Sequence, residues 1–313
     1  MSDFRVLEEN DIRKAISMAQ TIELMKEAFV QISKKSAKVP VRMALDQIDQ
    51  KGRVLFMPAY SPDYHLFGLK MVSVFPDNTK MNLPAIQGKM LVIDDENGTP
   101  KGLIDAEYLT ALRTGAASGL ATDLLARKDA RVLAIFGTGA QAHTQVEAII
   151  SIRKIEQILV YASTAEKARN FCKELNDSYN VACSPGVLEN LKTADIICTA
   201  TTSQNPLFEM EHIGRGVHIN GIGSYKPEIR EITSSIIANA MLVVDHRESA
   251  LSEAGDIIIP LQEKTIAPEH IYAELGEIVS GSKPGRTNED QITVFKSVGN
   301  AVQDLAVASF LLQ

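Results

Sequence analysis

The spacing of apolar positions predicts helices first and strands next. Apolar residues recur every three to four positions over 10–19 and 21–33, which predicts two amphipathic helices with Asp11 and Thr21 as N-caps. The period then changes to two, which predicts strands in four segments: 38–47, 52–60, 67–77 and 89–106. Asn97-Gly98 favours a hairpin turn. A long helix is predicted over 107–127.

The second half of the chain alternates short apolar runs with helical stretches. The runs are 131–136, 157–162, 181–183, 194–200, 216–222 and 240–245. Six strands in this rhythm are typical of a Rossmann-type, doubly wound parallel sheet. A final helix over 295–312 is expected to fold back on the first domain. We therefore predict an α/β protein with an α+β domain (1–127 with 294–313) and a Rossmann domain (128–293).

A glycine turn follows the first of these runs. Residues 137–142 read G-x-G-x-x-A, directly after a predicted strand and directly before a predicted helix. Gly137 permits a tight turn, Gly139 lets a pyrophosphate approach the backbone, and the helix N-terminus offers free N–H groups. The predicted cofactor residues of this turn are Gly137, Thr138, Gly139, Ala140 and Gln141.

The end of the next strand bears on the choice of cofactor. An NAD site usually carries an acidic residue about twenty positions after the glycines. Here Ser163 and Thr164 occupy that region, with Lys167 and Arg169 nearby. Hydroxyl and cationic groups accept a 2′-phosphate, so the sequence favours NADPH, with NADH use possible. The alternative is that Ser163 or Thr164 caps the following helix.

Three cations occur in mainly apolar segments. Lys70 shares a strand face with Val72 and Val74, so it is either buried, with a charged partner or a lowered pKa that suits proton transfer, or an edge lysine with a solvated head. Arg113 stands at the margin of a helix stripe, beside a run of small residues that favours close helix packing. Arg42 alternates with apolar residues and fits the solvated face of a strand. Together the three could bind a small carboxylate.

Composition limits the classes of function. The 313 residues are 45% hydrophobic and 23% charged, with a net charge of −7, which disfavours nucleic acid and anionic membranes as partners. The acidic N-terminus does not resemble a signal peptide. The three cysteines suit a reducing cytoplasm, and the six histidines form no metal-binding motif, so we expect a cytoplasmic protein without a metal.

Several motifs together resemble the ornithine cyclodeaminase/μ-crystallin family over nearly the whole chain. They are "GLKMV", "LPAIQGKMLVIDDENGTPKGLIDAEYLTALRTGAASGLA", "IFGTGAQA", "TATTSQNP", "HINGIGSYKPEIREI" and "TVFKSVGNAVQDLA". The resemblance implies a homodimer formed through the N-terminal domain, and a substrate bound in the cleft between domains. It implies that Arg42, Lys70 and Arg113 bind substrate and that Thr114 contacts the cofactor. Further cofactor positions are expected at Ala200, Thr201, Thr202 and Gly223, and a ligand contact at Ser297, which should start the last helix.

One loop distinguishes the branches of this family. Ornithine cyclodeaminases and archaeal-type alanine dehydrogenases carry an aspartate shortly after its glycines, whereas this chain has Tyr225, a candidate substrate contact. The "S-x-K-P-E-x-R-E" pattern is closer to the ketimine reductases. The loss of an acid/base carboxylate disfavours deamination.

The resemblance therefore implies NAD(P)H-dependent reduction of a small cyclic imino acid. We expect 1-pyrroline-2-carboxylate to be reduced to L-proline, with 1-piperideine-2-carboxylate (giving pipecolate) as a second substrate. Arg113 and Arg42 would hold the carboxylate, and Lys70 would bind the carboxylate or the imine nitrogen and assist protonation. The alternatives are an ornithine cyclodeaminase, an alanine dehydrogenase-like reductive aminase, and a non-catalytic NADPH-dependent ligand-binding protein.

Overall fold

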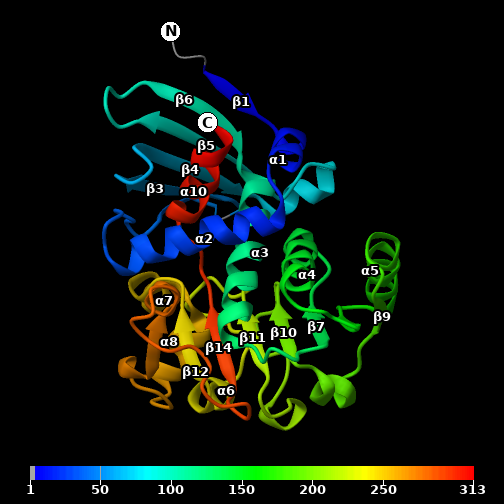
Figure 1. Ribbon diagram of the computed structural model, residues 1–313. Coiled ribbons are helices and arrows are strands. Elements are labelled where there is room, and N and C mark those ends of the chain that lie inside the picture. Colours follow the sequence, from blue (N-terminus) through cyan, green and yellow to red (C-terminus); the bar gives the residue numbers. More distant parts are fainter. Residues whose placement is uncertain (1–3, 50) are drawn as a thin grey trace. The chain divides into compact units, whose positions relative to one another are not determined.

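The chain forms two compact units, which Figure 1 labels by element. The structure, a computed structural model, describes residues 4–49 and 51–313. Unit 1 comprises the chain up to Arg113 together with Gly299–Gln313, and unit 2 is Thr114–Val298. The boundaries therefore fall inside helix α3 (Ala106–Leu125) and just after strand β14 (Thr293–Lys296), rather than at 127/128 and 293/294.

Unit 1 is built on a six-stranded mixed sheet. Its order is β1-β6-β5-β4-β3-β2, and among the described strands of this sheet only β1 and β6 pair in parallel. The strands are β1 (Arg5–Leu7), β2 (Met43–Asp46), β3 (Arg53–Ser61), β4 (Leu66–Val74), β5 (Ile86–Asp94) and β6 (Pro100–Asp105). Because β2 begins at Met43, Arg42 precedes the strand in which the sequence placed it.

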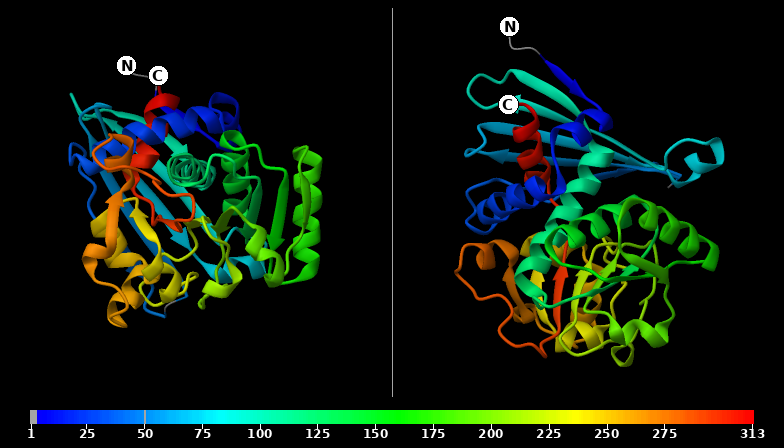
Figure 2. Two further views of the ribbon diagram at one scale, coloured as in Figure 1. Left: turned by 60° about the horizontal axis from the view of Figure 1, so that its bottom comes forward. Right: turned by 45° about the vertical axis from the view of Figure 1, so that its right-hand side comes forward.

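Two helices cover one face of this sheet. Helix α10 (Ala301–Leu311) contacts β3, β4 and α2 (Met18–Ser33), and Figure 2 shows α2 in blue and α10 in red on the same side of the sheet. The N-cap predictions for the first two helices were wrong. Helix α1 (Glu9–Ala15) is capped by Glu8, with Asp11 as the reciprocal partner of its capping box, and α2 is capped by Ser17.

The other face of the sheet is apolar and exposed. Side chains alternate along a strand, so Phe67, Leu69 and Met71 of β4 point away from the face that α10 covers. They are 43%, 38% and 45% exposed, and the strand pairing places Met43 and Leu45 of β2 on the same side. We refer to these five residues as the apolar sheet face.

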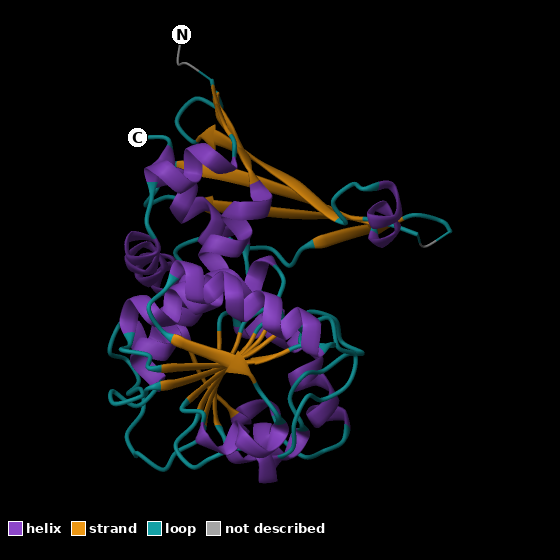
Figure 3. Cartoon of the chain, turned by 90° about the vertical axis from the view of Figure 1, so that its right-hand side faces the viewer, coloured by secondary structure: helices purple, strands orange, loops and turns teal. Residues whose placement is uncertain are grey.

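Unit 2 is a doubly wound domain whose sheet is entirely parallel, which confirms the predicted fold class. Its order is β13-β12-β14-β11-β10-β7-β8-β9. Figure 3 shows helices on both faces of the sheet. The strands are β7 (Val132–Phe136), β8 (Gln157–Tyr161), β9 (Ala182–Pro185), β10 (Ile196–Thr199), β11 (His218–Gly221), β12 (Met241–Val244), β13 (Ile271–Glu274) and β14.

The sequence prediction missed two of these strands. Strand β13 was not predicted, and β14 was assigned in part to the last helix, although it pairs with both β11 and β12. All four residues of β14 are buried, and so short a segment cannot be told from helix by the period of its side chains. The last helix therefore begins at Ala301.

The helices of unit 2 connect the strands. They are α4 (Ala140–Ile152), α5 (Ala165–Ser178), α6 (Ser234–Asn239), α7 (Arg247–Glu253), α8 (Gly255–Gln262) and α9 (Leu275–Val279). Helix α3 packs closely on α4. A Cβ added at Gly115 would lie only 2.4 Å from the Thr144 carbonyl oxygen, so a larger residue would not fit. The small residues of α3 thus permit helix packing, as their pattern favoured. Within residues 4–49 and 51–313, no helix has the length and apolarity needed to span a membrane.

Candidate functional site

Lys70 lies in the core of unit 1. It stands in the middle of β4, an inner strand, and its neighbours across the sheet are Met57 and Met90. Its side chain is 1% exposed, so it is not an edge lysine with a solvated head. A lysine buried between two methionines needs a partner, since an unpaired ammonium in such a place is strongly destabilising.

The partner is Asp304, on α10. The Lys70 Nζ lies 2.7 Å from Asp304 Oδ2, and the Arg113 Nε lies 3.1 Å from Asp304 Oδ1. One fully buried carboxylate therefore holds two cations that come from a strand and from a different helix. The sequence prediction missed Asp304. The available signal was an acidic residue directly before the mainly apolar run "LAVASFLL" (305–312).

The start of α10 fixes the two arginines. Arg113 Nη1 donates to Gln303 Oε1 (3.0 Å), and Arg42 Nη2 donates to the Gly299 carbonyl oxygen (2.8 Å). Gly299 has a φ of 76°, and an added Cβ would lie 2.4 Å from Arg113 Nη1. Glycine is thus required here both by the backbone and by the guanidinium. We call Arg42, Lys70, Arg113 and Asp304 the cationic cluster.

Burial and charge set the protonation of the cluster. Burial lowers the pKa of Lys70 to about 7; the attraction of Asp304 opposes this shift, and Arg113 and Arg42 add to it. For Asp304, burial alone would raise the pKa, but Arg113 and Lys70 outweigh it and lower the pKa of that carboxyl group. Near neutral pH, Asp304 is a carboxylate and Lys70 can both hold and release a proton.

Unit 2 contains a pocket at the carboxyl end of β7, where the glycine turn lies. Its volume is about 630 Å³. It is lined by Phe136, Gly137, Thr138, Gly139, Tyr161, Ala162, Ser163, Lys167, Leu188, Ala200, Thr201, Thr202, Ser203 and Leu207. Seven predicted cofactor residues are among these: Gly137, Thr138, Gly139, Ser163, Ala200, Thr201 and Thr202.

The two glycines of the turn are needed for different reasons. Gly137 has a φ of 106°, and an added Cβ would lie 2.4 Å from the Ala200 carbonyl oxygen. Gly139 is the N-cap of α4, and a Cβ there would meet no described atom within 4 Å. Protein packing therefore does not demand glycine at 139. The open space above a helix N-terminus fits a diphosphate, which needs close access to backbone N–H groups.

The helix-cap interpretation of the 163–164 segment is confirmed, and the same segment borders the pocket. The Thr164 hydroxyl caps α5 by accepting from the Lys167 N–H (3.2 Å). Lys167 Nζ lies 3.4 Å from Ser163 Oγ, and both residues line the pocket. The pocket thus has a hydroxyl and an ammonium where an NAD site carries an acid.

Other predicted residues lie outside this pocket lining. Ala140 and Gln141 begin α4, and Thr114 is buried on α3. Tyr225 is 39% exposed in the segment after β11. Ser297 follows β14 in unit 2 and does not start the last helix; its hydroxyl donates to Asp245 Oδ2 (3.0 Å).

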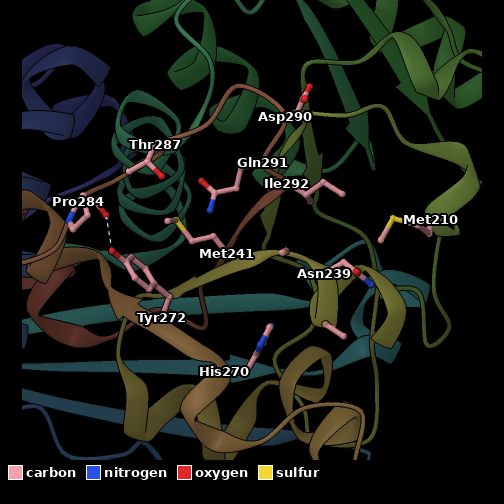
Figure 4. Close-up of a pocket in the computed structure, with 12 residues that line it drawn as sticks. Met210, Asn239, Met241, His270, Tyr272, Pro284, Thr287, Asp290, Gln291 and Ile292 are labelled. Carbon is pink, nitrogen blue, oxygen red and sulfur yellow. Dashed lines mark hydrogen bonds between the residues drawn. The ribbon is translucent and has the colours of Figure 1, made fainter.

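A second pocket of unit 2 lies at the opposite edge of the sheet. It has a volume of about 750 Å³ and is bordered by Met241, the first residue of β12, and Ile292, which precedes β14 (Figure 4). Ligands of such sheets bind beyond the carboxyl ends of the strands, so this pocket is not the cofactor site. In the part of the chain that the structure describes, no group of three or more His, Cys, Asp or Glu side chains could hold a metal ion.

Comparisons with known proteins find relatives over nearly the whole chain. A Δ1-pyrroline-2-carboxylate reductase of Bacillus cereus is 38% identical over 311 residues, which are 98% of this chain and 95% of that protein. The structure of Thermococcus litoralis Δ1-pyrroline-2-carboxylate reductase in complex with NADH and L-proline superposes with a TM-score of 0.93 at 39% identity, covering 98% of this chain and 96% of that one. An archaeal alanine dehydrogenase dimer with bound NAD also gives a TM-score of 0.93, at 32% identity, covering 99% and 95%.

A family model also matches nearly the whole chain. The model of the ornithine cyclodeaminase/mu-crystallin family matches residues 3–313. Both units are therefore included in the match. The chain belongs to the ornithine cyclodeaminase/mu-crystallin family.

Proposed function

We propose that this protein is an NAD(P)H-dependent reductase of small cyclic imino acids, with 1-pyrroline-2-carboxylate as substrate and L-proline as product. The observation that carries the proposal is the buried lysine of the cationic cluster, held with Arg113 by the single carboxylate of Asp304. Relatives that share the fold and more than a third of their residues are named for this reaction. The six-membered 1-piperideine-2-carboxylate is a second expected substrate.

Each residue of the cluster has a task in this reaction. Arg113 and Arg42 bind the substrate carboxylate, since guanidinium groups bind carboxylates through paired hydrogen bonds. A bound nicotinamide cofactor supplies the hydride that reduces the imine carbon. Lys70 holds a proton at Nζ that the imine nitrogen needs, because a protonated imine is far more electrophilic. Asp304 keeps Lys70 and Arg113 in place and balances their charge.

We propose that the cofactor is NADPH, with NADH as an alternative. Ser163 and Lys167 support this choice, because they line the pocket with groups that attract a 2′-phosphate. Gly137, Thr138 and Gly139 would hold the diphosphate at the start of α4. NADH is bound in the Thermococcus litoralis relative, which supports NADH as the alternative.

The loop after β11 separates this function from its alternatives. Tyr225 stands where the sequence comparison expects an aspartate in cyclodeaminases, so the chain lacks that carboxylate for amine oxidation. The similarity to an alanine dehydrogenase supports reductive amination of a short 2-oxo acid as the second candidate.

We also propose a cytoplasmic homodimer formed through the apolar sheet face. Five exposed apolar side chains on one sheet form a contiguous patch of the kind that monomeric proteins rarely expose. A related alanine dehydrogenase is a dimer. Light scattering tests this: the wild type should have twice the chain mass, and Leu69→Asp should reduce it to one chain.

One assay tests the function. Purified protein is mixed with NADPH and pyrroline-2-carboxylate, and separately with ornithine and NAD, and proline is quantified in each. Proline from the first mixture alone supports the proposal. Proline and ammonia from ornithine, without net cofactor turnover, would indicate a cyclodeaminase. A third mixture contains pyruvate, ammonia and NADPH. Alanine formed in it, without proline in the first mixture, would favour reductive amination of a short 2-oxo acid.

A further inference from the structure

Two loops of unit 2 meet at the carboxyl ends of β10 and β11. Thr201 lies in the loop after β10 and lines the cofactor pocket, and Gly223 lies in the loop after β11. The loops are in direct contact, because a Cβ added at Gly223 would lie 2.4 Å from the Thr201 carbonyl oxygen. In doubly wound sheets the second half of a dinucleotide binds over this side of the sheet.

Glu231 joins the two loops. Its Oε1 accepts hydrogen bonds from the Thr201 N–H (2.8 Å) and the Thr201 hydroxyl (2.6 Å), and its Oε2 accepts one from the Gly223 N–H (2.7 Å). The Thr201 hydroxyl is the donor, because a carboxylate only accepts, and its oxygen in turn accepts from the Ser203 N–H (3.0 Å). Three donors therefore point at one carboxylate, which requires two acceptor oxygens.

The Glu231 side chain is fully buried, and Asp256 holds the backbone at Glu231 in place. Asp256 Oδ1 accepts from the N–H groups of Glu231 (2.8 Å) and Ile232 (3.0 Å), and Asp256 Oδ2 lies 3.0 Å from Lys296 Nζ. Glu231, Asp256 and Lys296 are all 0% exposed. Burial, with Asp256 nearby, raises the pKa of Glu231. Three hydrogen bonds satisfy the Glu231 carboxylate, and an ion pair balances the buried charges of Asp256 and Lys296.

Gly223 shows how tightly the loops are held. An added Cβ would lie 2.5 Å from Glu231 Oε1 as well as against the Thr201 carbonyl oxygen. The loop after β11 is thus in direct contact with the Glu231 carboxylate. A shift of Glu231 must move Thr201, Gly223 or both.

We propose that Glu231 is a positioning residue for the nicotinamide end of the cofactor. It acts by setting the separation of the Thr201 and Gly223 loops, and it leaves the adenosine end, which the glycine turn and the 163–167 segment would hold, unaffected. The inference rests on the proposed function for the identity of the cofactor. It assigns a purpose to the last glutamate of "KPEIRE", which the substrate and cofactor predictions did not use.

The test compares Glu231→Gln with Glu228→Gln. The amide has the same shape but only one acceptor, so it cannot serve both Thr201 and Gly223. Glu228 is exposed in the same segment and provides a matched control. Two ligands are titrated: NADPH, followed by its own fluorescence in a chain without tryptophan, and 2′-phospho-ADP-ribose, which lacks the nicotinamide. Turnover with pyrroline-2-carboxylate is measured in parallel.

We expect Glu231→Gln to weaken NADPH binding about tenfold, to change 2′-phospho-ADP-ribose binding less than twofold, and to lower kcat more than it raises the KM for substrate. Thr201→Val, which removes one of the three donors, should give a smaller shift in the same direction and serves if Glu231→Gln fails to fold. Equal weakening of both ligands in the folded variants, or no change in either, overturns the proposal.

The binding measurements separate this inference from the proposed function. A wild type that binds NADPH but does not reduce the imine removes the reductase function, while the two-ligand comparison still decides the role of Glu231. A wild type that binds neither ligand overturns both.

Discussion

The cationic cluster of unit 1 and the cofactor pocket of unit 2 are built in opposite ways. In the cluster, buried side chains hold one another: Asp304 binds Lys70 and Arg113 in a region with almost no exposed surface. In the pocket, the backbone of a glycine turn and a helix N-terminus face open space. A cluster of this kind fails when one charge is removed, whereas a backbone site tolerates side-chain changes that leave the turn intact.

This difference has a chemical consequence. The pocket needs only fixed N–H groups, because binding a diphosphate involves no proton transfer. Under the proposed function, the cluster holds a proton whose release is matched to neutral pH, and burial beside two arginines shifts the pKa of Lys70 in that direction. Changes in unit 1 should therefore alter substrate and proton handling, and changes in the pocket should alter cofactor binding.

Asp304→Asn should have the largest effect. It removes the charge that balances Lys70 and Arg113, so we expect kcat/KM for the imine to fall about a thousandfold and the free energy of unfolding to drop by about 3 kcal/mol. Steady-state rates and urea unfolding measure these. NADPH affinity should stay within twofold, and Asp63→Asn, an exposed site in the same unit, should behave as wild type. An active, stable Asp304→Asn protein would contradict the account of the cluster.

Arg113→Lys should be the next most damaging change. Lysine keeps the charge but cannot contact Asp304, Gln303 and a carboxylate at once, so we expect the KM for substrate to rise about a hundredfold. Isothermal titration should show unchanged NADPH binding. Arg215→Lys, on the surface of unit 2, is the control. A parallel loss of cofactor affinity would remove the distinction between the two regions.

The pH dependence should reveal Lys70. Its lowered pKa of about 7 means that the protonated form is present below this pH and is lost as the pH rises through it. If Lys70 supplies the proton, kcat/KM should decline about tenfold per pH unit above neutrality. Lys70→Arg stays protonated, so it should be slower but lack this decline. A wild-type rate that is constant to pH 9 would exclude Lys70 as the proton source.

Ser163→Asp should have the smallest and most selective effect. A carboxylate beside the 2′-phosphate repels it, so we expect kcat/KM with NADPH to fall about tenfold while that with NADH stays within twofold. The substrate KM should not change. Ser163→Asn, of similar size but uncharged, separates repulsion from crowding. Equal losses with both cofactors would mean that the segment acts only as a helix cap.

The two regions also differed in how far the sequence predicted them. The glycine turn is contiguous, and strand, turn and helix follow one another within residues 132–152, so local rules sufficed. In the cluster, Lys70 and Asp304 are in contact although they lie 234 residues apart in the chain. Arg42, Lys70 and Arg113 were predicted, but which of them are buried was not, and Asp304 was missed because no local pattern specifies a partner so distant.

Strand β14 illustrates a second limit. Four buried residues fit either a strand or the start of a helix, and only pairing with β11 and β12 decides between them. Ser297 was misplaced for the same reason. The sequence shows Glu231 only as part of the "KPEIRE" motif. Its hydrogen-bonding role could not be predicted, because its three donors come from two loops that the fold brings together.

The distance along the sequence between Asp304 and Lys70 also affects when unit 1 can fold during synthesis. A ribosome that adds about 5–20 residues per second places Lys70 in the chain at least ten seconds before the carboxylate that neutralises it, 234 residues later. During that interval β4 cannot bury an ionised lysine without penalty, so unit 1 completes its core only after translation has passed through the whole of unit 2. Nascent chains halted before residue 304 should remain sensitive to protease in their first hundred residues, although the same stretch is resistant in the finished protein.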